Sequence, residues 1–396
     1  MLLKRMGSQT SMFNTNNINE YQIEITTYCN AACPQCPRNI NGGVNNPYLK
    51  LEHLSPDVIN STFTDDICNS IDRVFFCGGY GDPIMHPKFL NILKTFRSKN
   101  PHLWLFLHTN GSAHDTEYWG EMGRILNGYG HVEFNIDGLS DTNKLYRINT
   151  NFDKILENAK SFINNGGKAK WNFIVFKHNE HQVEDARILA NEMGFEEFST
   201  RATGRFMNHK TLNEHKTWEV VDRNNAKTHE LEIPVAMEYK NNSLQNSNKL
   251  TTEYFNDTEI LCDALCKNPA NSRYNIDNNV KVIINAHGWV MPCNFFNHNL
   301  YDARFRDRNI MPSSHDLSFL PNGDNQIQDL FNRHDASNNL NINEKSLNDI
   351  FKSPFWEEII SSWDKKIGEG RIFECAMTCG SKLNKVWDQT RKEGNK

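Results

Sequence analysis

Three cysteines stand at C-x3-C-x2-C spacing near the start of this 396-residue chain, directly after a strand-like run. They are Cys29, Cys33 and Cys36, within the stretch from Thr26 to Asn39. Structural zinc sites need four protein ligands and usually take them from two separated pairs, whereas three thiolates on one loop suit an iron-sulfur cluster with one iron left open. The spacing therefore predicts a metal cluster with a free coordination position. A zinc loop or a set of buried thiols is the alternative.

Between about Tyr21 and Arg205, short β-rich runs alternate with amphipathic segments, the pattern of repeated βα units around a parallel sheet. We predict six strands, at residues 21–25, 72–77, 103–107, 132–136, 170–176 and 197–200. Ser55-Pro56 and Pro87 predict helix starts, and the run 164–167 predicts a helix stop. Right-handed crossovers put the carboxyl ends of all the strands on one face, where ligands bind in such folds. Six units are too few for a closed eight-stranded barrel, so we expect an open, partial (β/α)6 barrel.

Polar or glycine-containing motifs follow the first four predicted strands. The cysteine loop follows the first, Gly78-Gly79-Tyr80-Gly81-Asp82-Pro83 the second, Thr109-Asn110-Gly111 the third and Asn135-Ile136-Asp137-Gly138 the fourth. Glycines allow positive φ angles and a close approach of backbone to ligand, although a plain tight turn uses the same residues. Asparagine and aspartate at strand ends can line a pocket or simply satisfy turn amides. These motifs predict a ligand site at the carboxyl face of the sheet.

Cys29, Cys33 and Cys36 resemble the cluster motif of the radical S-adenosylmethionine (SAM) superfamily, whose members share an open partial barrel. The resemblance implies a 4Fe-4S cluster that binds the amino and carboxylate groups of SAM. It also implies reductive cleavage of SAM to methionine and a 5'-deoxyadenosyl radical, which abstracts hydrogen from a substrate. An external one-electron reductant of the flavodoxin or ferredoxin type would supply the electron. The family often has an aromatic residue before the third cysteine, and this chain has Gln35 there.

The same resemblance gives roles to the motifs at the strand ends. The turn from Gly78 to Pro83 is similar to the Gly-Gly-x-x-Pro type motif that holds the SAM amino group, and Met85-His86-Pro87 also fits the family pattern. Tyr146-Arg147 resembles a family pair, in which the guanidinium could grip the SAM carboxylate, a substrate acid or a surface partner. The implied cofactor-binding residues are Gly78, Gly79, Gly81, Asp82, Pro83, Thr109, Asn110, Asn135, Asp137, Arg147 and Val175. Tyr80, Asp137 and Arg201 are the polar candidates for catalysis.

A second group of cysteines lies beyond the predicted barrel: Cys262, Cys266, Cys293, Cys375 and Cys379. The run from Val280 to Cys293 predicts a β-hairpin that presents a thiol. Gly288, five residues before Cys293, followed later by a close cysteine pair, resembles the twitch region, a shortened SPASM domain. The resemblance implies an auxiliary 4Fe-4S cluster held by Cys293, Cys375, Cys379 and either Cys262 or Cys266. A structural zinc site made of four thiolates is the alternative.

Composition limits the remaining choices. The formal charge of −5 gives no attraction to phosphate backbones, so we expect no nucleic-acid partner. Ten cysteines, a polar start without a signal peptide and no membrane-length apolar run favour a reducing cytoplasm. Cys68 and Cys77 are predicted to be buried apolar thiols. We expect a flexible leader at 1–18, the barrel at 19–205, a polar linker at 206–260 and an auxiliary-cluster domain with a hairpin and helices at 261–396.

These patterns together predict a radical SAM enzyme that acts on a peptide or a small molecule, of the peptide maturase or small-molecule dehydrogenase or epimerase type. An iron-sulfur electron carrier or a metal-sensing module is the alternative. Such a protein would also use clustered cysteines, but it would need neither the glycine turn nor the polar set at the strand ends. Turnover of SAM separates the two hypotheses.

Overall fold

The computed structural model describes residues 13–206, 216–241, 252–262, 264–266, 279–301, 326–381 and 390–393. Most of the predicted leader and the centre of the predicted linker lie outside these residues, and so does the side chain of Cys266. None of the helices in the described part of the chain combines the length and the apolar character needed to cross a membrane.

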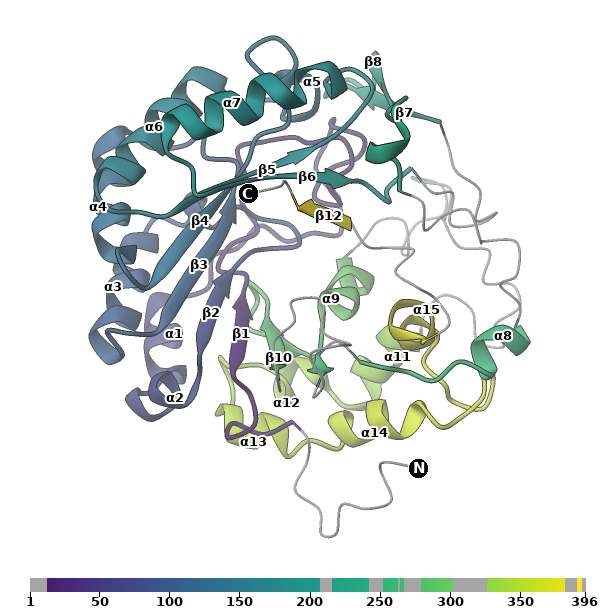
Figure 1. Ribbon diagram of the computed structural model, residues 1–396. Helices are drawn as coiled ribbons and strands as arrows, with labels where there is room; N and C mark the ends of the chain where they lie inside the picture. The colour runs from purple at the N-terminus through teal and green to yellow at the C-terminus, as the bar shows by residue number, and fades with distance from the viewer. Residues whose placement is uncertain are drawn as a thin grey trace.

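A sheet of ten strands organises the described residues (Figure 1). Its centre consists of β1 (Glu20–Ile23), β2 (Arg73–Phe76), β3 (Trp104–Thr109), β4 (Gly130–Asn135), β5 (Ala169–Ile174) and β6 (Glu197–Ala202). These six strands pair in chain order and are all parallel. The sheet has two ends and does not close on itself. The predicted open, partial barrel of six βα units is therefore confirmed.

Both ends of this parallel sheet are covered by the C-terminal half of the chain. At one end, β10 (Asn279–Ile284) lies parallel to β1 and is followed by β11 (Val290–Met291), which pairs with it in the antiparallel sense. The short strand β9 (Leu265–Cys266) pairs with the start of β10. At the other end, β12 (Thr390–Glu393) lies antiparallel to β6. The predicted hairpin is thus confirmed, and the edges of the parallel sheet are paired instead of open to solvent.

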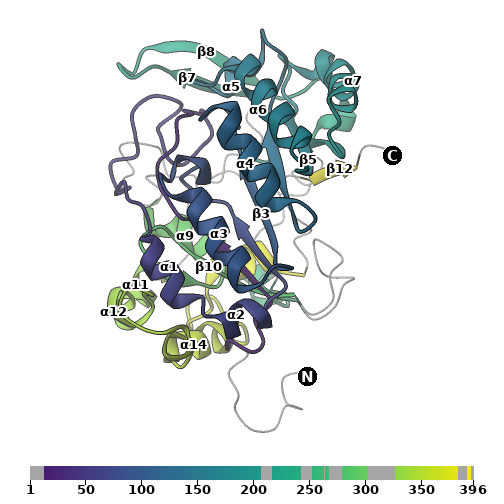
Figure 2. The same ribbon diagram turned by 90° about the vertical axis from the view of Figure 1, so that its left-hand side faces the viewer.

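Helices cover the outer face of the sheet (Figures 1 and 2). They are α1 (Pro56–Thr62), α2 (Asp65–Ser70), α3 (Phe89–Lys99), α4 (Thr116–Leu126), α5 (Asn143–Tyr146), α6 (Phe152–Asn164) and α7 (Val183–Met193), with short 3-10 turns η2 (Pro83–Met85) and η3 (Glu180–Gln182). Successive strand side chains alternate, so Leu105 and Leu107 of β3 are fully buried toward the helices while Phe106 and His108 face the concave side partly exposed. Ser55 caps α1 by accepting from the Asp57 backbone N–H, as predicted.

The C-terminal helices lie below or to the right of β1 and β10 in Figure 1, with α8 farthest from the sheet. They are α8 (Thr252–Asn256), α9 (Asn294–Tyr301), α11 (Gln326–Arg333), α12 (Ala336–Asn339), α13 (Leu347–Phe351), α14 (Pro354–Ser362) and α15 (Phe373–Cys379). Buried residues such as Phe355 and Trp356 of α14 belong to the same continuous apolar core as the barrel. The C-terminal half is therefore packed against the barrel as part of one core.

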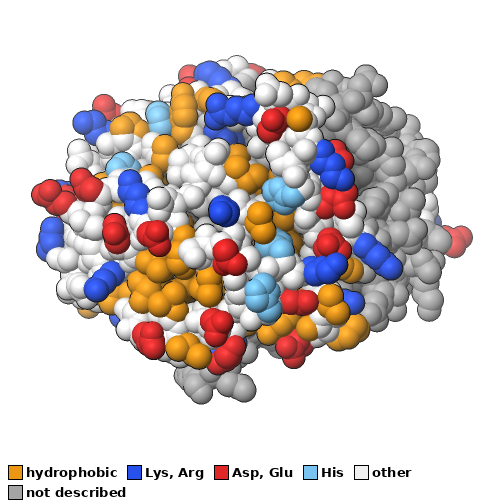
Figure 3. All heavy atoms as spheres, turned by 90° about the horizontal axis from the view of Figure 1, so that it is seen from above, with side chains coloured by type: hydrophobic (Ala, Val, Ile, Leu, Met, Phe, Trp, Pro, Cys, Tyr) orange, Lys and Arg blue, Asp and Glu red, His pale blue; other side chains and the backbone are white. Residues whose placement is uncertain are grey.

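A β-hairpin lies within the range predicted as a polar linker. Its strands are β7 (Thr217–Val221) and β8 (Lys227–Glu232), and the turn η4 (Met237–Tyr239) follows. Val220 and Leu231 pack with Ala31 and Cys33 of the cysteine loop. This hairpin lies at the upper right of the barrel in Figure 1, and across the upper face acidic and basic side chains are interspersed (Figure 3). That described face thus carries no extended patch of a single charge.

Candidate functional site

The three-cysteine loop runs from the carboxyl end of β1 toward α1 and is closed by its own hydrogen bonds. The Cys36 backbone N–H donates to the Cys33 carbonyl at 2.9 Å. Two further donors from other elements approach the sulfurs: Asn110 Nδ2 lies 3.8 Å from Cys29 Sγ, and Arg147 Nη1 lies 3.6 Å from Cys33 Sγ. Hydrogen bonds to sulfur stabilise the thiolate form and tune the potential of a cluster that it binds.

An apolar shell surrounds this loop. Cys33 is buried, and it packs with Tyr146, Ile174 and Phe176 from the barrel and with the hairpin β7–β8. Burial raises the pKa of the Cys29 and Cys33 thiols, and the neighbouring thiols raise it further, while Arg147 opposes the shift at Cys33. The loop by itself therefore favours neutral thiols, and a bound metal would supply the positive charge that deprotonates them.

Gln35 provides a separate test of whether a ligand fits this loop. Its side chain is 4% exposed, and neither its amide nitrogen nor its amide oxygen has a hydrogen-bond partner in the described part of the chain. Buried amides without partners are rare, because each costs the free energy of removing it from water. A polar ligand beside the loop would satisfy this amide, so the residues present fit a cofactor with hydrogen-bonding groups.

The glycine turn after β2 is packed closely by two other parts of the chain. None of Gly78, Gly79 and Gly81 adopts a positive φ, so the close approach of other groups, and not a left-handed backbone, explains these glycines. A Cβ at Gly81 would overlap the Thr26 carbonyl oxygen, and one at Gly78 would overlap the Glu24 carboxylate. A Cβ at Gly79 would lie 3.1 Å from the His298 ring of α9. These positions are glycine because the chain beyond β1 and helix α9 press directly against the turn.

Glu24 is a central residue of the site that the sequence analysis missed. Its Oε1 accepts from the backbone N–H groups of Tyr80 at 2.7 Å and Gly81 at 3.1 Å, and its Oε2 accepts from Asn297 Nδ2 at 3.2 Å. The residue is 2% exposed, and burial raises the pKa of Glu24 to about 7 although these hydrogen bonds lower it. The available signal was a carboxylate at the end of an apolar predicted strand.

Asp82, Thr109 and Asn110 tie the second and third strand ends together. The Asp82 carboxylate accepts from Thr109 Oγ1 at 3.1 Å and from the Asn110 backbone N–H at 2.8 Å and side chain at 2.7 Å. It also accepts from the Ile84 backbone at 3.3 Å, after Pro83 starts η2. Asn135 Nδ2 reaches the Thr109 carbonyl at 3.3 Å. The structure thus brings together the polar residues predicted from separate motifs, with Asp82 as the group that joins them.

Asp137 and Arg147 form a buried ion pair beside the cysteine loop. Arg147 Nε lies 2.6 Å from Asp137 Oδ2, and the Ile174 backbone N–H donates to Asp137 Oδ1 at 2.6 Å. Asp137 is 0% exposed, so a surface ion pair is excluded. Both carboxylate oxygens are engaged within the protein, and the pair aims the Arg147 guanidinium at Cys33 Sγ.

The remaining predicted residues lie in three different surroundings. The Tyr80 hydroxyl points to α9 and donates to the His298 carbonyl at 3.2 Å. Arg201 lies on the concave face, with its Nη2 3.4 Å from Glu133. Val175 is fully buried in the main core, whereas its neighbour Ile174 packs with the cysteine loop. The Val175 side chain therefore packs away from the cysteine loop, and the role in cofactor binding that the family resemblance implies for Val175 stays a prediction.

Cys68 and Cys77, both predicted to be buried apolar thiols, lie in different surroundings. Cys68 of α2 is fully buried as predicted, with its Sγ near the Phe63 carbonyl at 3.6 Å. Cys77 is only partly buried, and it follows β2 directly before the glycine turn. Burial and the carboxylates of Glu24 and Asp82 raise the pKa of Cys77, so this thiol is neutral.

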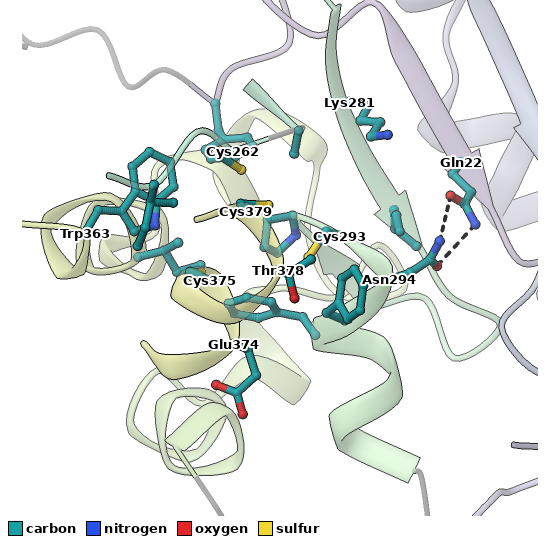
Figure 4. Close-up of a pocket in the computed structure, with 18 residues that line it drawn as sticks. Gln22, Cys262, Lys281, Cys293, Asn294, Trp363, Glu374, Cys375, Thr378 and Cys379 are labelled. Atoms are coloured by element: carbon teal, nitrogen blue, oxygen red, sulfur yellow. Dashed lines mark hydrogen bonds between the residues drawn. The ribbon is translucent and has the colours of Figure 1, made fainter. Parts of the chain in front are cut away.

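Four of the five C-terminal cysteines line one cavity of about 90 Å³ (Figure 4). Cys375 and Cys379 lie one turn apart on α15, Cys293 follows β11, and Cys262 lies between α8 and β9. The Leu261 backbone N–H donates to the Cys379 carbonyl at 2.8 Å and fixes the Cys262 segment against the end of α15. The structure thus gathers Cys262 with the three others. For Cys266, only the backbone is described, paired with Asn279.

Burial and the neighbouring thiols raise the pKa of three of these thiols, those of Cys262, Cys293 and Cys375. The pKa of Cys262 is raised by its hydrogen bond with Cys379 and by burial, and that of Cys375 by burial and by its neighbouring thiols. Burial likewise raises the pKa of Cys293 to about 12, against the lowering effect of Lys281. Within the described residues, no three Cys, His, Asp or Glu side chains are arranged to hold one metal ion.

The fold and the site together define a partial parallel βα barrel with a cysteine-lined centre at the carboxyl ends of its strands. Residues 23–190, less than half of the chain, match the model of the Radical SAM superfamily. The matched range includes the cysteine loop, the glycine turn and the strands β2 to β5 in full.

Several solved structures resemble the chain. SuiB of Streptococcus suis bound to precursor peptide SuiA is 14% identical with a TM-score of 0.45, covering 71% of this chain and 60% of that one. Native anSMEcpe with bound AdoMet is 12% identical with a TM-score of 0.47, covering 87% and 84%. BtrN in complex with AdoMet and 2-DOIA is 12% identical with a TM-score of 0.37, covering 91% and 92%. The chain thus spans about 60% of the SuiB length. No curated protein matches it.

Proposed function

We propose that this chain is a radical SAM enzyme that cleaves SAM reductively and uses the resulting radical to abstract hydrogen from a peptide or small-molecule substrate. The observation that carries the proposal is the three-thiol loop with two N–H donors near its sulfurs, placed beside the glycine turn within the range that matches the Radical SAM superfamily model. When bound, a 4Fe-4S cluster and SAM would supply the electron transfer and the 5'-deoxyadenosyl radical.

In this proposal, different residues of the chain bind the cluster, donate hydrogen bonds to its ligands and bind SAM. Cys29, Cys33 and Cys36 would ligate three irons and leave the fourth for SAM. Asn110 and Arg147 donate toward the sulfurs, and the apolar shell with the hairpin β7–β8 excludes water from the loop. We assign the turn from Gly78 to Pro83 to the SAM amino group, and Thr109 and Asn135 to the walls of the same site. In this assignment Asp82 and Asp137 position their neighbours, because their oxygens are engaged within the protein.

We also propose that Cys262, Cys293, Cys375 and Cys379 hold an auxiliary 4Fe-4S cluster, with Cys262 as the fourth ligand in preference to Cys266. The support is the shared cavity and the convergence of the four side chains on it (Figure 4). Ligands of a four-iron cluster each bind a different iron and stand farther apart than the ligands of one zinc ion. The hydrogen bond between Cys262 and Cys379 places two of the four thiols close together, so metal analysis is needed to separate a cluster from a zinc site made of the same thiolates.

The central experiment replaces Cys29, Cys33 and Cys36 together by alanine. After anaerobic reconstitution with iron and sulfide, and with a one-electron reductant of the flavodoxin or ferredoxin type, the wild type is expected to form 5'-deoxyadenosine and methionine from SAM. The triple variant is expected to form neither above background, because no ligand remains for the cluster. Cys68→Ala is the matched control, since this thiol is buried in α2 away from the site. Product formation by the triple variant, or none by the wild type, contradicts the proposal.

A further inference from the structure

The turn from Gly78 to Pro83, which we assign to SAM, is held in place by side chains from two distant parts of the chain. Glu24 comes from the end of β1, and Asn297 comes from α9 in the C-terminal half, 273 residues away in sequence. Both are buried, at 2% and 1% exposure. The conformation of the turn therefore depends on Asn297, which lies outside the barrel segment.

Glu24 fixes the conformation of the turn through its backbone. One carboxylate oxygen accepts from two successive N–H groups, those of Tyr80 and Gly81. This bifurcated contact holds the peptide between them in one orientation, and so sets where the other groups of the turn point. The missing Cβ atom of Gly78 is what lets the carboxylate lie this close.

Asn297 in turn fixes Glu24. Its Nδ2 donates to Glu24 Oε2 at 3.2 Å, while its Oδ1 accepts from Asn285 Nδ2 at 3.2 Å at the end of β10. One helical turn earlier, Asn294 exchanges two hydrogen bonds with Gln22 of β1 (Figure 4). Helix α9 is thus hydrogen-bonded to the β1 segment twice, through Asn294 to Gln22 and through Asn297 to Glu24. The second of these contacts reaches the glycine turn, because Glu24 accepts from its backbone.

The same helix touches the turn directly. The Tyr80 hydroxyl donates to the His298 carbonyl, and Gly79 faces the His298 ring. Since α9 starts directly after Cys293, the segment that begins at the wall of the C-terminal cysteine cavity ends against the glycine turn.

We propose that Glu24 and Asn297 are positioning residues for SAM binding, and that the SAM site is complete only when α9 of the C-terminal half is docked on β1. This inference rests on the proposed function. It assigns to these residues a role in orienting the backbone of the turn, without contact to SAM.

The test measures SAM dissociation constants for the full chain reconstituted with iron and sulfide. Asn297→Leu and Glu24→Leu are each expected to weaken SAM binding by about tenfold or more, since the first removes a donor to the buried carboxylate and the second removes the carboxylate that accepts from the turn. Glu24→Gln is expected to fall between the wild type and Glu24→Leu, because its amide oxygen still accepts from the two backbone N–H groups while its NH2 group faces Asn297 Nδ2 and cannot accept from it. The charge-transfer absorbance of the cluster is expected to be unchanged in all three variants.

Asn19→Leu is the matched control. Asn19 stands just before the opposite end of β1, where it likewise joins β1 to β10, accepting from the Val280 N–H at 2.8 Å and donating to Asp72 at 3.1 Å. Asn19→Leu should remove hydrogen bonds between β1 and its neighbours, as Asn297→Leu does, but it should leave the glycine turn unchanged. SAM affinity should therefore change less than about twofold. The EPR spectrum of the reduced cluster provides the second readout, because it changes when SAM binds the open iron.

The outcomes separate this inference from the proposed function. If the wild type neither binds SAM nor shows the EPR change, both fail. If the wild type binds SAM and Asn297→Leu binds it equally well at full cluster absorbance, only the positioning role is overturned. An equal loss in Asn19→Leu and Asn297→Leu would also overturn it, because the effect would then be one of general stability. Asn297→Leu keeps the test decisive even where Glu24→Leu does not fold.

Discussion

At the scale of single residues, the site consists of buried polar groups that are satisfied by one another, with Gln35 as the exception among the described residues of the loop. Asp82, Asp137 and Glu24 each accept several hydrogen bonds from different strand ends. Gln35, between Cys33 and Cys36, has no partner in the described part of the chain for either end of its amide. A network of satisfied groups specifies one geometry, whereas the unsatisfied amide identifies where a ligand would be bound.

Gln35→Met keeps the size of the side chain and removes the amide. We expect the metal-free protein to become more stable by about 1–3 kcal/mol, because a buried amide without partners is lost. The same substitution should weaken SAM binding several-fold, because the ligand loses its hydrogen bonds. Urea unfolding of the metal-free protein and SAM titration of the reconstituted protein measure the two effects. Unchanged stability together with unchanged SAM affinity would show that the amide has neither role.

Glu24 predicts a pH dependence of stability. Its pKa is raised from 4.5 to about 7 in the folded protein, so between these values the folded state holds a proton that the unfolded state has released. Stability therefore falls as pH rises from about 4.5 to about 7, by up to roughly 3 kcal/mol at about 1.36 kcal/mol per pH unit. Glu24→Gln should remove this part of the slope. Urea unfolding of both proteins at about pH 5 and about pH 7.5 is the measurement, and parallel slopes would contradict the assignment.

At the scale of elements, residues 217–232, which the sequence predicts to be part of a polar linker, form the hairpin β7–β8. Its exposed face is charged, and Lys227 pairs there with Glu230 at 2.5 Å. Its buried face places Val220 and Leu231 against the cysteine loop, and the Val221 N–H donates to the Asn41 carbonyl at 3.0 Å. We therefore expect the hairpin to shield the proposed cluster from water and oxygen.

Leu231→Ala should loosen this cover. The side chain is fully buried, so its truncation is expected to cost about 2–5 kcal/mol of stability and to speed the loss of cluster absorbance in air several-fold. Lys227→Ala, on the exposed face of the same hairpin, is the control, because surface ion pairs contribute little. The decay of absorbance after exposure to air provides the comparison. Equal decay in the two variants would show that the hairpin does not protect the loop.

At the scale of the whole molecule, the C-terminal half adds strands to both ends of the parallel sheet and contributes a second group of cysteines. Strand β10 extends the parallel sheet beyond β1, β12 covers the edge at β6, and α9 reaches the glycine turn. The four thiols of the cavity are contributed by three separate segments of this half. The two proposed cofactor sites are thus joined through one folded unit, whose main core runs from the barrel into the C-terminal helices.

Cys375→Ala/Cys379→Ala should separate the two sites in function. The wild type is expected to carry roughly eight irons and about eight acid-labile sulfides per chain, and the variant about half, since two four-iron clusters are proposed. The variant should still form 5'-deoxyadenosine but fail to complete turnover of its substrate. Iron, sulfide and zinc analysis of both proteins is the measurement. Zinc in the wild type in place of the second four irons, or no loss of iron in the variant, would contradict the auxiliary cluster.

Much of this architecture is local and could be predicted from the sequence. All six barrel strands, the hairpin that ends at Cys293 and the cap of α1 depend on side-chain alternation or on neighbouring residues. The three-cysteine spacing and the order of motifs after the strands could likewise be read directly. Parallel βα units then place these motifs at one face, whatever the details of their packing.

Only the tertiary structure decided which distant groups meet. Segments that lie far apart in the chain are joined by the hydrogen bond between Glu24 and Asn297, by the addition of β10 beside β1 and by the cavity that Cys262 lines with Cys293 and Cys375. The tertiary structure also shows that the side chain of Ile174, and not that of its neighbour Val175, packs with the cysteine loop. Sequence periodicity specifies the face that an element buries, but the partner of that face is selected by packing and hydrogen bonding in the folded core.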